Sequence, residues 1–373
     1  MRRARGVGCN KSTLYASRSS PFALRLNMSI PSTMRSPRFK GQGQIDFVEK
    51  IVPVPGPGQL LMQVRANALC GSERGQFYNG TEITPGHEAS GVVVAAGPDT
   101  HTVIGIPGVT FLMDFCGECR SCKLGLTNQC LNKRGDTGFN RDGGYGAYEL
   151  VSERTFFPVD LDLDLTEATL LLDVMGTNGH AIQRAQRVHP DIQSVLVSGA
   201  GPVGLGMLAM AKIIFGHDMP VLISDVVPWR LQLAERLGGL PVNVKERSLQ
   251  EGLRQHQIDQ VDVAFDTSGK GAARQMALNA LAKRGVLVCV GHGEGLSLTV
   301  SSDLIAPERT LMGSEYFCFN ELPENLARLR QHRAYLSQII THRYAPADIQ
   351  AAFELFFRGE TGKVVIEQVL LGE

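Results

Sequence analysis

The pattern of hydrophobic and polar positions divides the chain into two regions of different texture. From about Gly43 to Phe157, short stretches of alternating apolar and polar residues are separated by Gly and Pro. Clear examples are residues 60–64, 91–95 and 147–151. This alternation is typical of strands that bury one face. We therefore predict a small, twisted β-rich domain with long loops.

The second region begins near residue 192 and alternates apolar strands with helices. The pattern predicts strands at residues 195–197, 221–224, 261–265 and 285–290, and helices at residues 202–215 and 229–237. Strands that alternate with helices indicate a parallel sheet wound on both faces. We predict an α/β protein in which residues 177–305 form this parallel-sheet domain.

The alternation of strands and helices ends after about Ala306. The strand-like run at residues 363–369 could rejoin the first domain. Residues 34–176 and 306–373 are therefore assigned to that domain. Residues 1–33 are rich in Arg and Ser and hold no acidic residue, which has two interpretations. They are an organelle transit peptide, or the start is assigned too far upstream and Met28 or Met34 is the true start. The second is favoured, because no clean amphipathic stripe is visible.

Composition limits the partners and the compartment. The 373 residues include 37 basic and 37 acidic side chains, but residues 1–33 carry only basic ones, so the remainder is mildly acidic. Such a body does not suggest a nucleic-acid or anionic-membrane partner. No apolar run approaches the roughly 18 residues needed to cross a bilayer. We expect a cytoplasmic protein, or a mitochondrial one if the tail is a transit peptide.

A glycine-rich turn between the first predicted strand and helix of the second region indicates a nucleotide site. Gly199, Gly201 and Gly204 permit a tight turn, close approach of a pyrophosphate, and close packing of helix on strand. Asp225 ends the next strand, where a carboxylate can accept both ribose hydroxyls of NAD and would repel the phosphate of NADP. A solvated Asp at a strand end is the ordinary alternative. The pattern favours NAD.

Four of the eight cysteines lie within fifteen residues, a pattern better suited to metal than to disulfides in a chain this long. They are Cys116, Cys119, Cys122 and Cys130. Four thiolates on one lobe can close a tetrahedral shell around a structural zinc with no open position. An iron–sulfur cluster is the competing interpretation of the same spacing.

Two further motifs carry possible metal ligands. Cys70 lies in Cys70-Gly71-Ser72-Glu73, and His87 in Pro85-Gly86-His87-Glu88. Each alone is explained by a buried thiol or a histidine in a turn. With the four-cysteine lobe, the segment Leu172-Asp173-Val174-Met175 and the Gly199 turn, however, the chain from about Gly43 resembles the zinc-dependent medium-chain dehydrogenase/reductase family.

The resemblance implies a GroES-like β-rich catalytic domain beside a Rossmann coenzyme domain. It implies that Cys70, His87 and Asp173 bind a catalytic zinc, so that the chain would hold two zinc ions and NAD. Glu88 matches a nearby or exchangeable ligand. Further matches are Thr177 beside the nicotinamide, Arg230 near the adenosine ribose, and Ser72 as the hydroxyl that relays the proton.

Two features depart from the family pattern. The relay often ends in a histidine five residues after the zinc cysteine, but Gly75 stands there, and water could replace the imidazole. The usual Gly-Asp-Arg-Val turn is represented only by the uncharged residues 105–109. We also expect residues 76–79 to line the substrate pocket.

The leading hypothesis is therefore a zinc- and NAD-dependent alcohol dehydrogenase. An acidic third ligand resembles the polyol and threonine enzymes, which implies a secondary alcohol on a polyol, cyclitol, sugar or hydroxy amino acid. Two alternatives stay open: an NADP-linked or zinc-free quinone or enone reductase of the same fold, and a non-catalytic zinc-binding module. A homodimer or homotetramer is expected by resemblance only.

Overall fold

The computed structural model describes residues 30–368, and the described residues from Pro31 onward form one compact unit. Most of the predicted tail, residues 1–33, lies outside the described residues. The first strand, β1 (Thr33–Gly41), begins one residue before the predicted boundary and pairs with β2 (Gln44–Ile51). No helix in residues 30–368 combines the length and apolar character needed to span a membrane.

The β-rich region is built around β3 (Gln59–Ala68), which confirms the predicted strand there. It pairs antiparallel with β4 (Ala89–Ala96) on one side, and with β6 (Tyr148–Ser152) and β15 (Lys363–Glu367) on the other. The strand near the C-terminus therefore rejoins the first region, as its pattern predicted. The other strands of this sheet are β5 (Pro107–Thr110), β7 (Phe156–Pro158) and β14 (Ile340–Tyr344).

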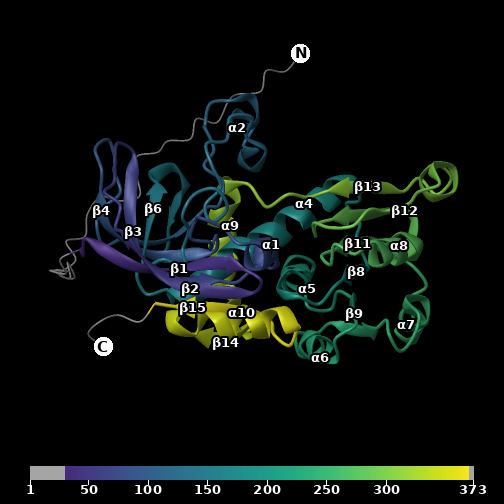
Figure 1. Cartoon of the computed structure of the whole chain (residues 1–373). Coiled ribbons are helices and arrows are strands. Elements are labelled where there is room, and N and C mark those ends of the chain that lie inside the picture. Colours follow the sequence, from purple (N-terminus) through teal and green to yellow (C-terminus); the bar gives the residue numbers. More distant parts are fainter. Residues whose placement is uncertain (1–29, 369–373) are drawn as a thin grey trace, which may run out of the picture. The chain divides into compact units, whose positions relative to one another are not determined.

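The second sheet has six parallel strands in the order β10-β9-β8-β11-β12-β13, drawn in teal and green in Figure 1. They are β8 (Val195–Ser198), β9 (Val221–Asp225), β10 (Leu240–Asn243), β11 (Val261–Asp266), β12 (Leu281–Cys289) and β13 (Thr310–Gly313). This order is that of dinucleotide-binding sheets. The sequence ended this domain at residue 305, but the sheet continues to Gly313. The pattern predicted four of the six strands; β10 and β13 were missed because each is short and mostly only partly buried.

Alternating side chains of β8 show why helices cover both faces of this sheet. Val195 and Val197 pack into one core with α4 (Asn178–Val188), α5 (Pro202–Phe215) and α6 (Pro228–Arg236). Leu196 points to the other face, where it packs with α7 (Leu249–Gln255) and α8 (Gly271–Ala280). All these positions are apolar because successive strand residues point to opposite faces and both faces are buried.

A short segment of π-helix, Leu172–Thr177, leads into α4. It is fully buried and carries Asp173 and Thr177. Single π-helical turns are frequent at functional sites, because the wider turn redirects side chains. The remaining helices are α1 (Arg74–Asn79), α2 (Arg120–Lys123), α3 (Leu165–Ala168), α9 (Leu322–Leu336) and α10 (Ile349–Arg358).

Candidate metal and nucleotide sites

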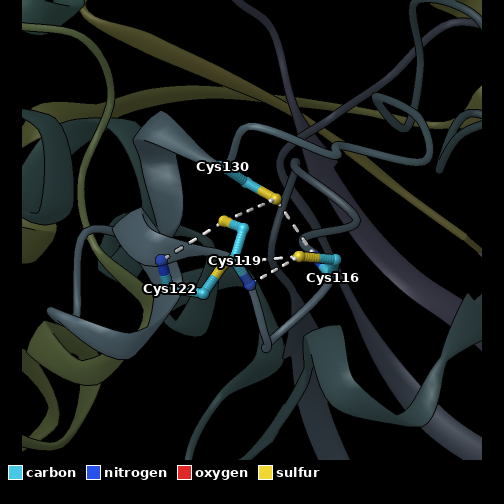
Figure 2. Close-up of side chains that lie close together, drawn as sticks. All are labelled: Cys116, Cys119, Cys122 and Cys130. Carbon is cyan, nitrogen blue, oxygen red and sulfur yellow. Dashed lines mark hydrogen bonds between the residues drawn. The ribbon is translucent and has the colours of Figure 1, made fainter.

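The four clustered cysteines converge in the structure, as Figure 2 shows. The sulfurs of Cys116 and Cys122 lie 4.0 Å apart, and those of Cys119 and Cys130 lie 3.9 Å apart. A tetrahedral zinc with bonds of about 2.3 Å places its sulfurs about 3.8 Å apart. A [4Fe–4S] cluster attaches each thiolate to a different iron, a [2Fe–2S] cluster attaches two to each of its irons, and either one spaces thiolates on different irons more widely. The spacing therefore fits a single ion.

Backbone N–H groups point at these sulfurs and favour thiolates. The Cys119 sulfur accepts from the N–H groups of Cys122 and Leu131, at 3.5 and 3.4 Å, and these bonds lower its pKa to about 6. The pKa of Cys116 is also lowered, chiefly by the backbone N–H of Glu118. Burial instead raises the pKa of Cys122 to about 12. A cation among the four sulfurs would favour the thiolate form of all of them.

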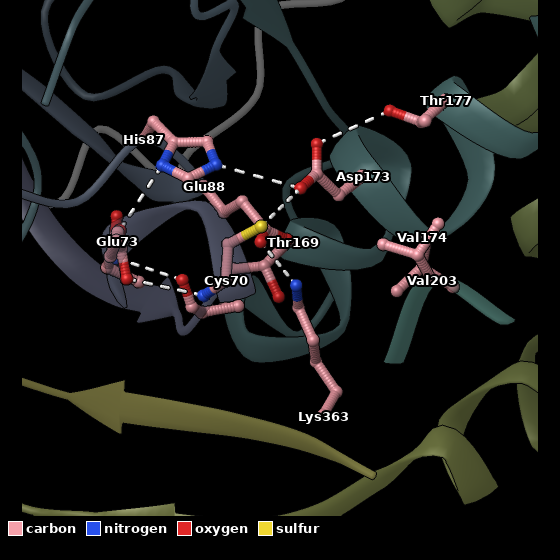
Figure 3. Close-up of polar contacts among 12 residues, drawn as sticks. Cys70, Glu73, His87, Glu88, Thr169, Asp173, Val174, Thr177, Val203 and Lys363 are labelled. Carbon is pink, nitrogen blue, oxygen red and sulfur yellow. Dashed lines mark hydrogen bonds and ion pairs between the residues drawn. The ribbon is translucent and has the colours of Figure 1, made fainter. Parts of the chain in front are cut away.

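A second cluster brings together Cys70, His87, Glu88 and Asp173, all four predicted from the sequence (Figure 3). One donor atom from each lies within 4.8 Å of the others. The Cys70 sulfur lies 3.0 Å from Asp173 Oδ2, and His87 Nε2 lies 3.6 Å from the same oxygen. All four side chains are buried. The fold thus joins residues that lie up to 103 positions apart in the sequence.

Three different elements position these donors. Cys70 follows the end of β3 and precedes the short 3-10 helix Gly71–Glu73. His87 lies just before β4, and Asp173 lies on the π-helical segment. Because β3 and β4 are paired neighbours, the loops at their shared end lie next to each other. The π-helical turn then presents Asp173 to that end.

Glu73 is a site residue that sequence reasoning missed. It belongs to the motif Cys70-Gly71-Ser72-Glu73, but no role was assigned to it from the sequence. Its Oε1 lies 3.2 Å from His87 Nδ1, and its Oε2 accepts from the hydroxyl of Tyr145 at 2.7 Å. Glu73 is fully buried. A carboxylate on the second ring nitrogen fixes the orientation of a metal-binding histidine and raises its basicity. Burial lowers the pKa of His87, but its bonds to Asp173, Cys70 and Glu73 outweigh burial and hold that pKa well above its usual range.

Lys363 is the second residue that sequence reasoning missed. It enters the cluster from β15, and its ammonium pairs with Glu88 Oε1 while both side chains are fully buried. Burial raises the pKa of Glu88 to about 8, although the charge of Lys363 opposes this. No sequence signal identified Lys363, because its partner lies 275 positions away.

The chemistry of this cluster fits a zinc ion. A thiol, an imidazole and carboxylates are the ligand types that zinc prefers, and here they face one another away from water. Glu88 Oε2 is buried without a hydrogen-bond partner among the described residues. The cluster holds two carboxylates and a thiol around one imidazole. A divalent cation would balance the negative charge of these acidic groups. With three protein ligands, such a site keeps one position open for a further oxygen ligand.

The predicted nucleotide turn has the geometry that its glycines imply. Gly199 adopts a φ of +97°, which glycine tolerates without strain. A Cβ on Gly204 would lie 1.8 Å from the Gly199 carbonyl oxygen, so only glycine fits there. Gly201 caps α5, whose first residue is Pro202. The turn therefore presents the amino end of α5 at the edge of the parallel sheet, where helix dipole and free N–H groups favour a phosphate.

Asp225 lies at the end of β9 beside this turn. Its Oδ2 accepts from the Ala200 N–H at 2.6 Å, and its Oδ1 accepts from the N–H groups of Val226 and Val227. Arg230 lies on α6, and its Nη1 is 3.8 Å from the position of a Cβ on Gly201. Burial lowers the pKa of Arg230, while Asp225 raises it. Arg230 thus lies beside the phosphate-binding turn as well as beside Asp225.

The remaining predicted residues lie around the second cluster. Thr177 Oγ1 is 3.4 Å from Asp173 Oδ1, and Ser72 is exposed in the short helix after Cys70. A Cβ on Gly75 would meet no atom within 4 Å, so open space stands where a relay histidine would lie. Phe77, from the expected pocket segment 76–79, instead packs in a core with Phe353. That expectation is wrong for Phe77, because helix α1 turns it inward.

Comparison with known proteins agrees with this geometry. Residues 56–160 match the family described as the alcohol dehydrogenase GroES-like domain, and residues 202–331 match that described as zinc-binding dehydrogenase. The chain is 30% identical over 353 residues to an L-threonine 3-dehydrogenase of Shewanella loihica, and the match covers 88% of this chain and 98% of the relative.

Two solved structures show the same fold. One is an alcohol dehydrogenase of Escherichia coli CFT073 complexed with NADH, with a TM-score of 0.81, 21% identity, and coverage of 90% of this chain and 100% of that chain. The other is a zinc-binding dehydrogenase of Sinorhizobium meliloti 1021 bound to NADP, with a TM-score of 0.79, 24% identity and the same coverage. The fold therefore occurs with either dinucleotide.

Proposed function

Because this chain belongs to the zinc-dependent medium-chain dehydrogenase/reductase family, we propose that it is an NAD-dependent alcohol dehydrogenase. Its substrate would be a secondary alcohol on a polyol, cyclitol, sugar or hydroxy amino acid. The observation that carries the proposal is the convergence of Cys70, His87 and Asp173 in one buried cluster. The relative that acts on threonine is consistent with an acidic third ligand.

Cys70, His87 and Asp173 would hold the catalytic zinc, and the four-cysteine lobe would hold a structural one. Zinc at the first site would supply Lewis acidity, which lowers the pKa of an alcohol. The chain's own residues shape that site. Glu73 fixes the ring of His87, and Lys363 pairs with Glu88 and so leaves three protein donors for the ion.

The proton released from the alcohol would pass to the hydroxyl of Ser72, an exposed residue two positions after Cys70. Because open space replaces the relay histidine at Gly75, water can take the proton from that hydroxyl. The buried positions of His87 and Asp173 keep bulk water from the donors themselves. The Ser72 hydroxyl therefore provides the route by which the proton leaves.

The dinucleotide would bind along the carboxyl ends of the parallel strands. The turn at Gly199 and the amino end of α5 would hold the pyrophosphate together with Arg230, and Asp225 would accept the ribose hydroxyls. Thr177, bonded to Asp173, would lie beside the nicotinamide, which accepts the hydride. The negative charge of Asp225 supports NAD over NADP.

The test combines metal analysis with a substrate screen. Purified protein is expected to contain about two zinc ions per chain. It should reduce NAD in the presence of one or more alcohols from a panel of polyols, cyclitols, threonine and simple alcohols, and reduce NADP more slowly. Zinc-free protein that reduces quinones or enones would contradict the proposal. So would protein that binds zinc but shows no binding of NAD in a titration.

A further inference from the structure

Tyr316 has an unusual backbone for a large buried residue. Six non-glycine residues among those described have positive φ, and Tyr316 is one of them at +45°. The other five are exposed polar residues: Gln42, Asp99, Gln257, Arg284 and Glu308. Tyr316 alone among them is buried, at 6% exposure. Residues held in sparsely populated conformations cluster at active sites, because the surrounding structure must stabilise them there.

The hydroxyl of Tyr316 is also unsatisfied. It is buried, and the backbone of Leu112 lies near enough to lower its pKa by a hydrogen bond, but the hydroxyl hydrogen has no acceptor among residues 30 to 368. A buried hydroxyl without a partner is costly, and most such groups in native proteins have one. A phenylalanine at this position would avoid the cost. The retained hydroxyl indicates a partner that arrives from outside the chain.

Packing connects Tyr316 to the second cluster through Phe317. Its ring contacts those of Phe111 and Phe317, with centroids 5.2 and 4.3 Å away. Phe317 in turn packs directly on Gly176, where a Cβ would lie 2.4 Å from its ring. Gly176 belongs to the π-helical segment that carries Asp173 and Thr177. Burial raises the pKa of Tyr316 well above its usual value, and the charges of Asp173, Glu88 and Cys70 raise it further.

We propose that Tyr316 contacts the substrate and donates its hydroxyl hydrogen to a second, uncharged oxygen next to the reacting carbinol. The inference rests on the proposed function and narrows its substrate class. A neutral phenol can hydrogen-bond a vicinal hydroxyl but cannot balance the charge of a carboxylate. The one ammonium in the cluster, that of Lys363, is already paired with Glu88. The site therefore selects vicinal diols and polyols over hydroxy amino acids.

The test is Tyr316→Phe, assayed with 2,3-butanediol and with 2-butanol, which lacks the second hydroxyl. Loss of one buried hydrogen bond should lower kcat/KM for the diol by about tenfold to a hundredfold and leave that for 2-butanol within about twofold. Tyr335→Phe is the matched control, because that hydroxyl bonds the Leu237 carbonyl in the coenzyme region. L-Threonine should be a poorer substrate than the diol for the unaltered enzyme.

Equal losses for both alcohols, or no loss for either, would overturn the role of Tyr316. Calorimetric titration of 2,3-butanediol into zinc-loaded protein with bound NADH provides a reading independent of turnover. Tyr316→Phe should weaken diol binding there, and unchanged binding would also overturn the inference. Failure of the proposed function looks different, since the unaltered protein would then oxidise no alcohol with NAD or NADP.

Discussion

The two cysteine-containing clusters are built in opposite ways. The four-cysteine lobe takes all its donors from residues 116–130, and its sulfurs are held by backbone N–H groups of the same segment. The second cluster takes its donors from three distant elements and holds them with other buried side chains, Glu73 and Lys363. The first has four like donors, whereas the second has a mixed set.

This difference is the one expected between the proposed structural site and the proposed catalytic site. Four thiolates saturate a tetrahedral ion, so the lobe offers a substrate no position. In the second cluster, Lys363 pairs with the fourth donor, Glu88, so three mixed donors would leave one position on the ion open. The open position of the second cluster depends on tertiary contacts. Substitutions there should therefore change turnover and the free energy of unfolding, whereas substitutions in the lobe should change zinc content and Tm.

The largest expected effect is that of Asp173→Asn on catalysis. The change keeps the shape of the side chain but removes the charge that would bind zinc, so kcat/KM should fall at least about a thousandfold. Steady-state kinetics measure this, and circular dichroism should show an unchanged fold. The exposed Asp259→Asn serves as the control. Turnover near that of the unaltered enzyme would remove Asp173 from the ligand set.

Lys363→Met should affect stability as well as activity. It leaves the fully buried Glu88 without its partner, and loss of one member of a buried ion pair costs about 3–5 kcal/mol. Urea unfolding of the zinc-loaded protein measures the loss. The double variant Lys363→Met, Glu88→Gln should recover most of it, because no uncompensated charge remains. Lack of recovery would indicate that Lys363 acts through packing alone.

Cys119→Ser should abolish zinc binding by the four-cysteine lobe and leave turnover nearly unchanged. We expect the zinc content to fall from about two ions per chain to about one, and Tm to fall by roughly 5 °C. The kcat at 25 °C should change by less than about twofold. Cys289→Ser, outside both clusters, is the matched control and should retain both ions. Loss of turnover with the catalytic zinc still bound would mean that the lobe is not purely structural.

Glu149 is a buried carboxylic acid that, unlike Glu88, is not paired with a lysine. Burial raises the pKa of Glu149 to about 8 from its ordinary 4.5. The folded state then keeps a proton that the unfolded chain has released, so Glu149 lowers stability as pH rises from about 4.5 to about 8. Glu149→Gln should therefore stabilise the protein by up to about 5 kcal/mol at pH 9 and have little effect at pH 4. A pH-independent difference would contradict this.

The sequence predicted features whose signal is local. The four-cysteine spacing, the turn at Gly199 and four strands of each sheet follow from short-range pattern, and the structure places them as expected. The second cluster became predictable only through the ordered set of family motifs, since Cys70 and Asp173 are 103 positions apart. Their roles as zinc ligands stay a prediction until metal analysis.

Residues that support the cluster could not be predicted in the same way. Lys363 meets Glu88 only because β15 pairs with β3, and the buried hydroxyl of Tyr316 is unusual only when its surroundings are known. Strand β13 was missed because three of its four residues are only partly buried and give no strong apolar signal. Tertiary pairing, which single-sequence patterns do not carry, decides each of these cases.

Because β15 pairs with β3, the second cluster can be completed only after β15 has been synthesised. The donors Cys70, His87 and Asp173 emerge from the ribosome early, but Lys363 and its strand are made among the last eleven residues of the chain. A nascent chain can close the cysteine lobe long before it can neutralise Glu88. A variant truncated before Lys363 would thus retain every proposed zinc ligand and still leave the buried Glu88 without its cation.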